Sequence, residues 1–346
     1  MEGFGDAFAS VQQWLFEAVV QPLAFALGAG NLLESAFDGT GWLVVGLLQI
    51  AVMLTVIGPL QRLWPVEPVT DRRAVAVDVI YTVVHRLGLF KLFMFFTFEN
   101  WLEEGIGVLR AHGMPTFHLD QLWPGVTDGA LVSFIIYLVV FDFANYAVHP
   151  AQHHFGWWWS LHSLHHAQRQ MTMWSDNRNH LLDDGLRDLL FVLLAILIGV
   201  APGQFVALVA ISQLSENFQH ANVRIWFGRI GERLWVSPRF HRLHHSVGIG
   251  HETPIKVTMS AAGPPQGAKA PSGGSAAHEV ASVGVKLGGY NFGVLLPWWD
   301  MLFGTANFEL RYDPTGVRDQ VEQGRDYGTG FWAQQLQGLK RLAGRG

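Results

Sequence analysis

The sequence predicts an all-α integral membrane protein with three to four transmembrane helices and a short re-entrant helical hairpin. Half of the 346 residues are hydrophobic and only 15% are charged, which is little charge for a water-soluble surface. Apolar runs long enough to cross a bilayer recur along the chain, and one of them has no charge for twenty positions. Composition and run length together therefore indicate helices that cross a membrane.

Three runs are predicted to span the bilayer. The clearest covers residues 41–60, which would rise about 30 Å as a helix, the thickness of the hydrocarbon core. A second covers 74–98 and contains four polar side chains, which we expect to face protein rather than lipid. The third, 129–149, leads directly into a cluster of histidines.

Two other apolar regions are too short or too polar for a clear span. Gly199, Pro202 and Gly203 divide residues 188–214 into two halves of about twelve residues, each too short to cross alone. This pattern predicts a helical hairpin that enters the membrane and returns. Residues 14–33 contain polar positions and are expected to form an interfacial helix or a weak span.

The distribution of charge predicts the orientation. Residues 1–61 contain no Lys or Arg, whereas 62–73 contain three. Positive charge favours the cytoplasmic side, so the N-terminus is expected outside and the histidine clusters in the cytoplasm. The Lys and Arg residues form no dense basic patch, and we therefore expect no nucleic-acid partner.

The chain is expected to divide into three parts. Residues 1–73 would hold the N-terminal membrane segments and a connecting loop. Residues 74–306 would form a histidine-rich membrane domain, with a flexible Gly/Pro/Ala/Ser-rich insertion at about 253–289. Residues 307–346 would be a C-terminal tail, with an amphipathic helix at 331–344 on the membrane surface.

Three histidine motifs have the spacing of metal ligands. They are H-x-x-x-H at 149–153 and two copies of H-x-x-H-H, "HSLHH" and "HRLHH". Residues three and four apart share one face of a helix, so we expect each motif to gather its rings on one face. The motifs supply eight ligands, which suit two metal ions better than one. These ligands are His149, His153, His162, His165, His166, His241, His244 and His245.

The surrounding carboxylates are candidates to hold the second nitrogen of each ligating ring. Asp142 and Asn145 precede His149 by seven and four positions, on the same helical face. Asp183, Asp184 and Glu216 flank later histidines. With no cysteine in the chain, thiolate sites and Cys-held iron–sulfur clusters are excluded. Imidazole-rich sites of this kind accept iron, zinc, copper or manganese.

These motifs resemble those of the fatty acid hydroxylase and sterol desaturase superfamily of membrane oxygenases. The likeness extends over about residues 74–306 and includes "NRNHLLDD" with Arg178 and His180, "FQHANV" with His220, and "NFGVLLPWWDMLFGT". The chain departs from the family where Pro150 replaces the usual Arg of the first motif. Because proline suits the first turn of a helix, Pro150 predicts a helix start at His149.

The resemblance implies a cytosolic helical cap whose histidines hold a di-iron centre, with His180 and His220 added to the ligands. Asp142, Asn145, Arg178 and Glu216 are the residues expected to support it. Dioxygen and two electrons would hydroxylate or desaturate a sterol-like, fatty acyl or carotenoid lipid. Iron is favoured for this use because iron activates dioxygen and zinc does not. The tryptophans at 157–159 are expected at the level of the lipid headgroups.

Electrons are expected from a separate reductase, ferredoxin or cytochrome b5-like partner. The chain has neither cysteines for an iron–sulfur cluster nor a G-x-G-x-x-G motif after a strand. The main alternative is a membrane zinc-dependent hydrolase acting on lipids, with Glu216 as the base. A haem-binding or metal-transporting protein is disfavoured, because transport sites lie within the spans and these histidines lie at span ends.

Overall fold

The computed structural model describes residues 2–94, 98, 100–247 and 289–345. These residues are helical or irregular; they form no named strand and have one isolated bridge, between Ser246 and Thr315. The predicted all-α class is confirmed for this part of the chain. The predicted insertion at about 253–289 lies almost wholly outside the described residues.

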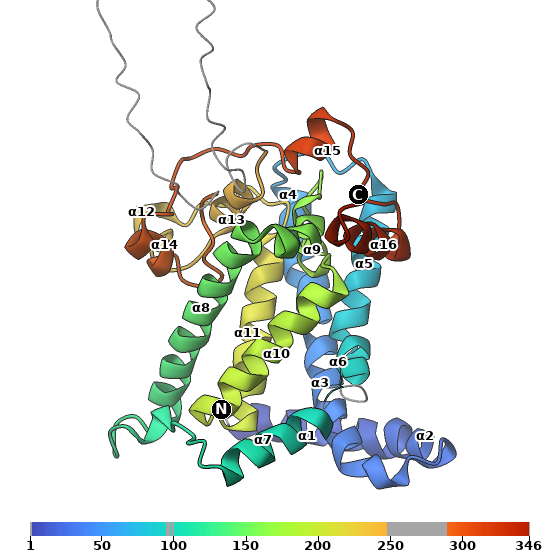
Figure 1. The fold of residues 1–346 in the computed structure, drawn as a ribbon, viewed down its shortest axis with the longest axis vertical. Helices are drawn as coiled ribbons and strands as arrows, with labels where there is room; N and C mark the ends of the chain where they lie inside the picture. The colour runs from blue at the N-terminus through green and yellow to red at the C-terminus, as the bar shows by residue number, and fades with distance from the viewer. Residues whose placement is uncertain (1, 95–97, 99, 248–288, 346) are drawn as a thin grey trace, which may run out of the picture.

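The helices form a lengthwise bundle with shorter helices across both ends (Figure 1). The N-terminal half contains α1 (Glu2–Leu15), η1 (Phe16–Val20), α2 (Gln21–Ala26), η2 (Gly30–Leu32), α3 (Leu33–Val52), η3 (Met53–Ile57), α4 (Gly58–Leu63), α5 (Arg72–Arg86), α6 (Leu89–Met94), α7 (Asn100–Ala111) and η5 (Leu119–Gln121). The remainder contains α8 (Ala130–His154), α9 (Gly156–His166), η6 (Ser175–Asn177), α10 (Leu181–Ile198), α11 (Pro202–Gln219), α12 (Gly228–Gly231), α13 (Pro238–His244), α14 (Trp298–Phe303), α15 (Arg318–Glu322) and α16 (Phe331–Leu342).

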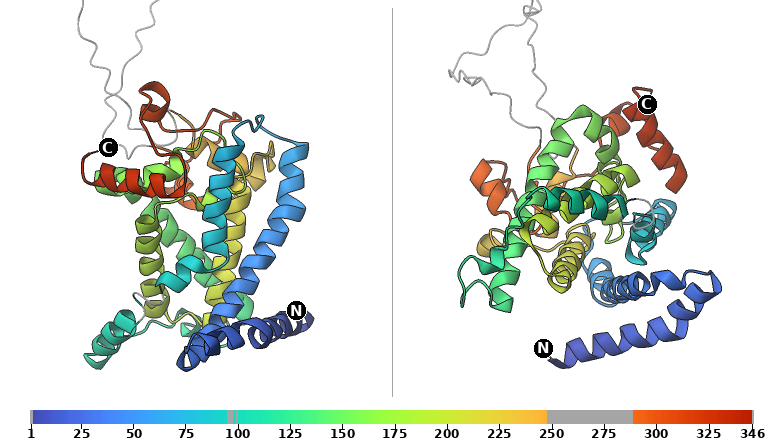
Figure 2. Two further views of the ribbon diagram at one scale, coloured as in Figure 1. Left: turned by 90° about the vertical axis from the view of Figure 1, so that its right-hand side faces the viewer. Right: turned by 60° about the horizontal axis from the view of Figure 1, so that its bottom comes forward.

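The two ends of the bundle differ. Helices α3, α5, α8, α10 and α11 run lengthwise, and α9, α13 and α16 gather at one end. Helices α1 and α7 lie across the opposite end (Figure 2). The stretch 14–33 is divided among α1, η1, α2 and η2, an arrangement closer to the interfacial expectation than to a span. All three histidine motifs belong to the end that carries α9 and α13.

Two helical runs are long and apolar enough to cross a membrane. They are Gly30–Leu63, which contains α3, and α8. Only 33% of the most apolar window of each run is buried, whereas the core helix of a soluble protein is mostly buried. The outward apolar faces therefore favour contact with lipid. This result confirms the helices predicted at 41–60 and 129–149.

The predicted span at 74–98 is not one helix, which corrects the expectation. Helix α5 ends at Arg86, and Gly88 has φ +76°, a left-handed conformation that glycine adopts without strain. Helix α6 then begins at Leu89. Helices α3 and α5 approach so closely that a Cβ on Gly46 would lie 1.7 Å from the Arg86 carbonyl oxygen. Glycine at position 46 is what permits this contact.

The two helices predicted within 188–214, with a break at 199–202, are present, but both are longer than expected. Helices α10 and α11 each contain 18 residues rather than about twelve. Gly199, in the left-handed conformation, ends α10, and Pro202 stands in the first turn of α11. Polar residues extend both helices toward the histidines, so hydropathy alone underestimates their length.

Pro150 predicted a helix start at His149, but α8 begins earlier in the chain. It runs from Ala130 through Pro150 to His154, a length of about 37 Å. Proline removes one amide donor but does not end this helix, whose last turns pack against α9. His149 and His153 therefore share a continuous helix. The core between α8, α10 and α11 contains Tyr137, Phe141, Ile198 and Leu208.

Candidate metal centre

Eight buried or half-buried histidines form two groups, each with four ring nitrogens within 4.8 Å of one another. Group one consists of His149, His153, His162 and His166. Group two consists of His165, His220, His241 and His245. The residues come from α8, α9, α13 and the end of α11. Segments far apart in the chain therefore meet here.

Each H-x-x-H-H motif directs rings toward both groups. In α9, the first and fifth positions (His162 and His166) belong to group one and the fourth (His165) to group two. Residues four apart on a helix differ by about 40° in direction, whereas adjacent residues differ by about 100°. The expectation that each motif gathers its three rings on one face is therefore wrong. Because the α9 motif supplies rings to both groups, it also holds the two groups next to each other.

The motif that begins on α13 places two rings in group two, whereas the motif on α9 places two in group one. His241 and His245 join group two, while the ring of His244 turns toward group one. Its centroid lies 4.4 Å from that of His149 and 4.7 Å from that of His166. The Nε2 atom of His244 is buried and has no hydrogen-bond partner. His244 is thus positioned as a further ligand of group one.

The spacing of the nitrogens in group two suits a cation. The Nε2 atom of His220 lies 3.2 Å from Nε2 of His165 and 3.1 Å from Nε2 of His241. The Nε2 atoms of His241 and His245 are also 3.1 Å apart. A tetrahedral ion with bonds of about 2.0–2.1 Å would separate its ligands by about 3.3 Å. The residues present therefore fit a metal ion.

Burial keeps the rings of group two neutral, as metal ligands must be. Burial lowers the pKa of His220 to about 4. It also lowers the pKa of His165, His241 and His245 well below its usual value, with a further contribution from the neighbouring rings. A neutral ring offers a lone pair toward its neighbours, and a shared cation would satisfy all four.

Asp183 orients a ring of group one directly. Its carboxylate accepts a hydrogen bond from Nδ1 of His162 at 3.0 Å, which leaves Nε2 to face the group. Gln152 and the indole N–H of Trp158 donate to the same carboxylate at 2.8 and 2.7 Å. Asp183 thus performs the supporting role that the sequence suggested for a nearby acid. Its neighbour Asp184 instead pairs with His85 at 3.2 Å.

Two backbone carbonyls orient His149 of group one and the adjoining His244. Nδ1 of His149 lies 2.8 Å from the carbonyl oxygen of Phe292, and Nδ1 of His244 lies 2.8 Å from that of Tyr290. No sequence signal identifies a backbone carbonyl as a ligand support. The Asp300 carboxylate holds this segment by accepting the amides of Phe292 and Gly293 at 2.9 and 2.7 Å.

Asp142 supports the same segment but touches no histidine. Its carboxylate accepts the amides of Leu295 and Leu296 and the indole N–H of Trp299, at 2.8, 3.2 and 2.8 Å. The expected role of Asp142 beside His149 is therefore indirect. It works through the backbone that carries the Phe292 carbonyl.

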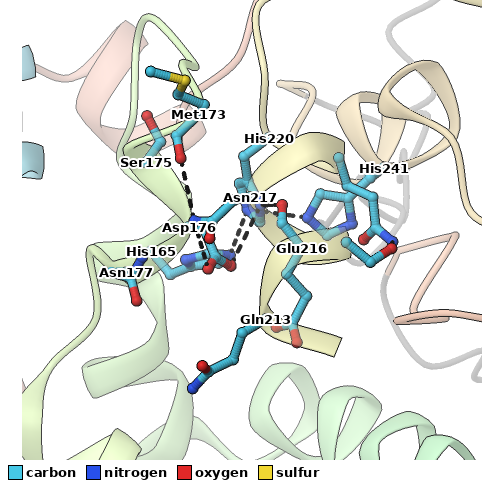
Figure 3. Close-up of polar contacts among 12 residues, drawn as sticks. His165, Met173, Ser175, Asp176, Asn177, Gln213, Glu216, Asn217, His220 and His241 are labelled. Atoms are coloured by element: carbon cyan, nitrogen blue, oxygen red, sulfur yellow. Dashed lines mark hydrogen bonds and ion pairs between the residues drawn. The ribbon is translucent and has the colours of Figure 1, made fainter. Parts of the chain in front are cut away.

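Helix α11 and Asp176 hold His220. Nδ1 of His220 lies 2.8 Å from the carbonyl oxygen of Glu216, one turn earlier, and 3.5 Å from Oδ1 of Asp176 (Figure 3). Asp176 is fixed in turn by Arg86 at 3.3 Å and Asn217 at 3.1 Å. Burial raises the pKa of Asp176 to about 6. Sequence reasoning missed Asp176, which precedes the Arg178 motif without any pattern of its own.

His180 lies outside both groups, contrary to its expected place among the ligands. Its Nε2 atom lies 2.9 Å from the carbonyl oxygen of Gln335, and its Nδ1 atom accepts the amide of Leu182 at 3.2 Å. A Cβ on Gly338 would lie 2.3 Å from the ring. The ring is occupied in fastening α16 to the start of α10, so neither nitrogen is available to an ion. Arg178 also lies elsewhere, 3.7 Å from Asp78.

Two of the three tryptophans at 157–159 lie against the histidine site. Trp158 is buried against Asp183, and the ring of Trp159 lies 5.1 Å from that of His153. Only Trp157 is half exposed, stacked on Trp158. Two of the three rings therefore belong to the wall of the histidine site.

A cavity of about 530 Å³ adjoins both groups and extends along the bundle. At the histidine end, its lining includes His149, His162, His165, His220 and His241. The predicted residues Asn145 and Glu216 also line it. Apolar residues of several helices, α10 and α11 among them, line most of the remainder, together with the charged Lys91 and Asp188. The volume is in the range of ligand-binding cavities.

Comparisons with known proteins agree with the histidine motifs. Residues 134–253 match the family model described as fatty acid hydroxylase, which confirms the resemblance over a shorter stretch than 74–306. A protein named ornithine lipid hydroxylase OlsE, from Rhizobium tropici, is 26% identical over 127 residues. That alignment covers 37% of this chain and 38% of the relative. No solved structure matches the chain.

Proposed function

We propose that this chain is a membrane-embedded oxidoreductase that uses two iron ions, dioxygen and external electrons to hydroxylate a lipid. The observation that carries the proposal is the pair of histidine groups, built from shared motifs beside one cavity. The match to the fatty acid hydroxylase model and the similarity to a protein named as a lipid hydroxylase support it.

The proposed reaction balances with one dioxygen and two electrons. A C–H bond, dioxygen, two electrons and two protons give a C–OH group and one water. Desaturation by the same site would instead remove two hydrogens from adjacent carbons and give two waters. The iron ions, when bound, supply the activation of dioxygen, since an unactivated C–H bond yields to no side chain of the protein alone.

The chain's own residues would position the substrate and the ligands. The imidazoles of both groups would hold the ions, oriented by Asp183, the Phe292 and Tyr290 carbonyls and the Glu216 carbonyl. The cavity would hold the lipid beside the histidines and exclude water from the reacting carbon.

The proposed topology places the histidine end in the cytoplasm. The run Gly30–Leu63 and α8 would span the bilayer, and the α10–α11 pair would enter and return. A separate electron-transfer protein would then reach the histidine end from the cytoplasm.

The test is metal content together with incorporation of labelled dioxygen. Protein purified from membranes should contain two irons per chain, and membranes that carry it should gain lipids with labelled oxygen. His165→Ala should lower both values. His112→Ala is the control because His112 is exposed in the turn directly after α7, at the opposite end of the bundle.

One zinc per chain with dioxygen-independent turnover would overturn the proposal in favour of the zinc-dependent lipid hydrolase. In that case Glu216, whose side chain faces the cavity, would be the candidate base. Full turnover by the purified protein with NAD(P)H alone would contradict the separate electron donor.

A further inference from the structure

The cavity changes from polar to apolar with distance from the histidines. On α10, the lining side chains run from Asp184 and Arg187 near the histidines to Phe191 and Ile196 farther along. On α11, they run in the opposite chain direction from Gln219 and Glu216 through Ser212 to Leu208 and Phe205. On α8, His149 and Asn145 are followed by Phe141. Three helices thus share one gradient.

Arg187 and Glu216 form a charged pair at the boundary of this gradient. Arg187 lies one helical turn from Asp183, which holds His162, and Glu216 lies one turn from His220. Four residues of an α-helix rise about 6 Å, so the pair lies just below the histidine layer. Arg187 Nη2 is 3.9 Å from Glu216 Oε2, too long for a strong hydrogen bond.

The pair has hydrogen-bonding capacity to spare. Within the described part of the chain, no side-chain hydrogen bond engages the guanidinium of Arg187 or the carboxylate of Glu216. Their side chains are 27% and 18% exposed, and both line the cavity. A guanidinium offers five N–H donors and a carboxylate about four acceptor positions. Enclosed groups of this kind are costly unless a ligand or water engages them.

Neighbouring charges in the cavity are already engaged. Asp184 pairs with His85 at 3.2 Å, and Arg86 bonds Asp176 and Asn217. The ammonium group of Lys91 lies 3.2 Å from the centre of the Trp42 ring, with Asp188 as its electrostatic partner. Arg187 and Glu216 are therefore the charged groups best placed to contact a ligand.

We infer that the cavity binds a lipid by its polar head, with the tail directed away from the histidines. The head would carry an anionic group for Arg187 and an amine for Glu216, as in a zwitterionic amino-acid amphiphile. The reacting carbon would then lie in the head or in the first carbons of the chain. A terminal-methyl site would place the head among Phe191, Ile196 and Phe205, whose side chains offer neither a hydrogen bond nor an opposite charge.

The first experiment measures binding to the protein as purified from membranes, without an electron donor, so that binding is independent of turnover. The probes are hexadecane, palmitate and Nα-palmitoyl-lysine, which share one chain length and differ in the head. We expect Nα-palmitoyl-lysine to bind most tightly and hexadecane most weakly. Glu216→Gln should weaken Nα-palmitoyl-lysine roughly tenfold without changing palmitate, whereas Arg187→Met should weaken both.

Matched variants control this experiment. Lys340→Met and Glu322→Gln remove exposed charges outside the cavity and should change no affinity. Arg187→Lys should recover part of the affinity that Arg187→Met loses. Equal binding of all three probes, or equal effects of the cavity and control variants, would overturn the inference.

The second experiment locates the new oxygen, and for this the inference rests on the proposed function. Lipids oxygenated with labelled dioxygen are fragmented by tandem mass spectrometry. Label in the head or the adjoining carbons is expected. Label beyond the middle of the tail would overturn the head-first orientation while leaving the hydroxylase proposal intact. Absence of label would overturn the hydroxylase proposal, while the probe ranking would still decide the orientation.

Discussion

His165 and His166 are adjacent in the sequence, yet their rings belong to different groups. Their side chains leave the helix in directions about 100° apart. His165 is joined in group two by His220 at 3.2 Å, whereas the ring of His166 lies 4.7 Å from that of His153. At the scale of single residues, the site is therefore two groups interleaved on the same helices rather than one cluster per motif.

This interleaving predicts different outcomes for two matched double variants. His165→Ala with His241→Ala removes two ligands from group two only and should leave about one ion per chain. His165→Ala with His166→Ala removes one ligand from each group and should lower the occupancy of both. Competition with a chelator, followed by metal analysis, measures the difference. Identical chelator titrations for the two variants would contradict the assignment.

Among the elements, the segment 290–305 does the most to position group one. Its carbonyls at Tyr290 and Phe292 fix two rings, and its backbone is held from both sides by Asp300 and Asp142. The Asp142 carboxylate comes from α8, the helix that also carries His149. The His149 ring contacts the segment 290–305 through the Phe292 carbonyl, and Asp142 of the same helix holds that segment by its backbone amides.

Asp300→Asn should weaken metal binding at group one by about 10–100-fold, the usual effect of losing a support of the ligands. An asparagine side chain offers one acceptor oxygen where Asp300 now receives two amides and the Thr305 hydroxyl. The measurement is metal affinity from chelator competition. Asp319→Asn is the control, because Asp319 bonds Arg325 and Tyr327 in the C-terminal tail. Unchanged affinity in Asp300→Asn would show that the carbonyls need no anchoring.

At the scale of the whole molecule, the histidine end is where distant segments of the bundle meet. Helices α8, α9 and α13 and the end of α11 converge there, and their buried nitrogens include Nε2 of His149 and His162. An unsatisfied buried polar atom costs about 1–3 kcal/mol, so a bound ion stabilises the convergence of these helices. Metal binding and folding are therefore expected to be coupled.

Removal of the metal should accordingly lower the midpoint of thermal unfolding. An ion at about 1,000 times its dissociation constant contributes about 4 kcal/mol of stability per site. For two sites, the midpoint should fall by roughly 10 °C or more. Scanning fluorimetry in detergent, before and after chelation, measures the shift, and iron should restore the original value. An unchanged midpoint in protein shown to be metal-free would contradict a structural role for the ions.

The sequence by itself determined which residues are candidate metal ligands and the helical class of the chain. Motif spacing identified the eight histidines of the three motifs, and the family resemblance supplied His220. Seven of those eight and His220 make up the two groups, and His244 adjoins group one. Apolar run length identified both candidate spans. These features are local, because ligand spacing and hydropathy are read within a few helical turns.

Only the tertiary structure decided which rings lie close enough to share an ion and what holds them. His180 has the right residue type, yet the packing of α16 occupies both of its ring nitrogens. The Phe292 carbonyl and Asp176 support histidine rings because the fold brings them to 2.8 Å from Nδ1 of His149 and 3.5 Å from Nδ1 of His220. The polarity gradient of the cavity likewise exists only once α8, α10 and α11 lie side by side. Contacts between distant segments depend on how the helices pack, and local spacing contains no information about that packing.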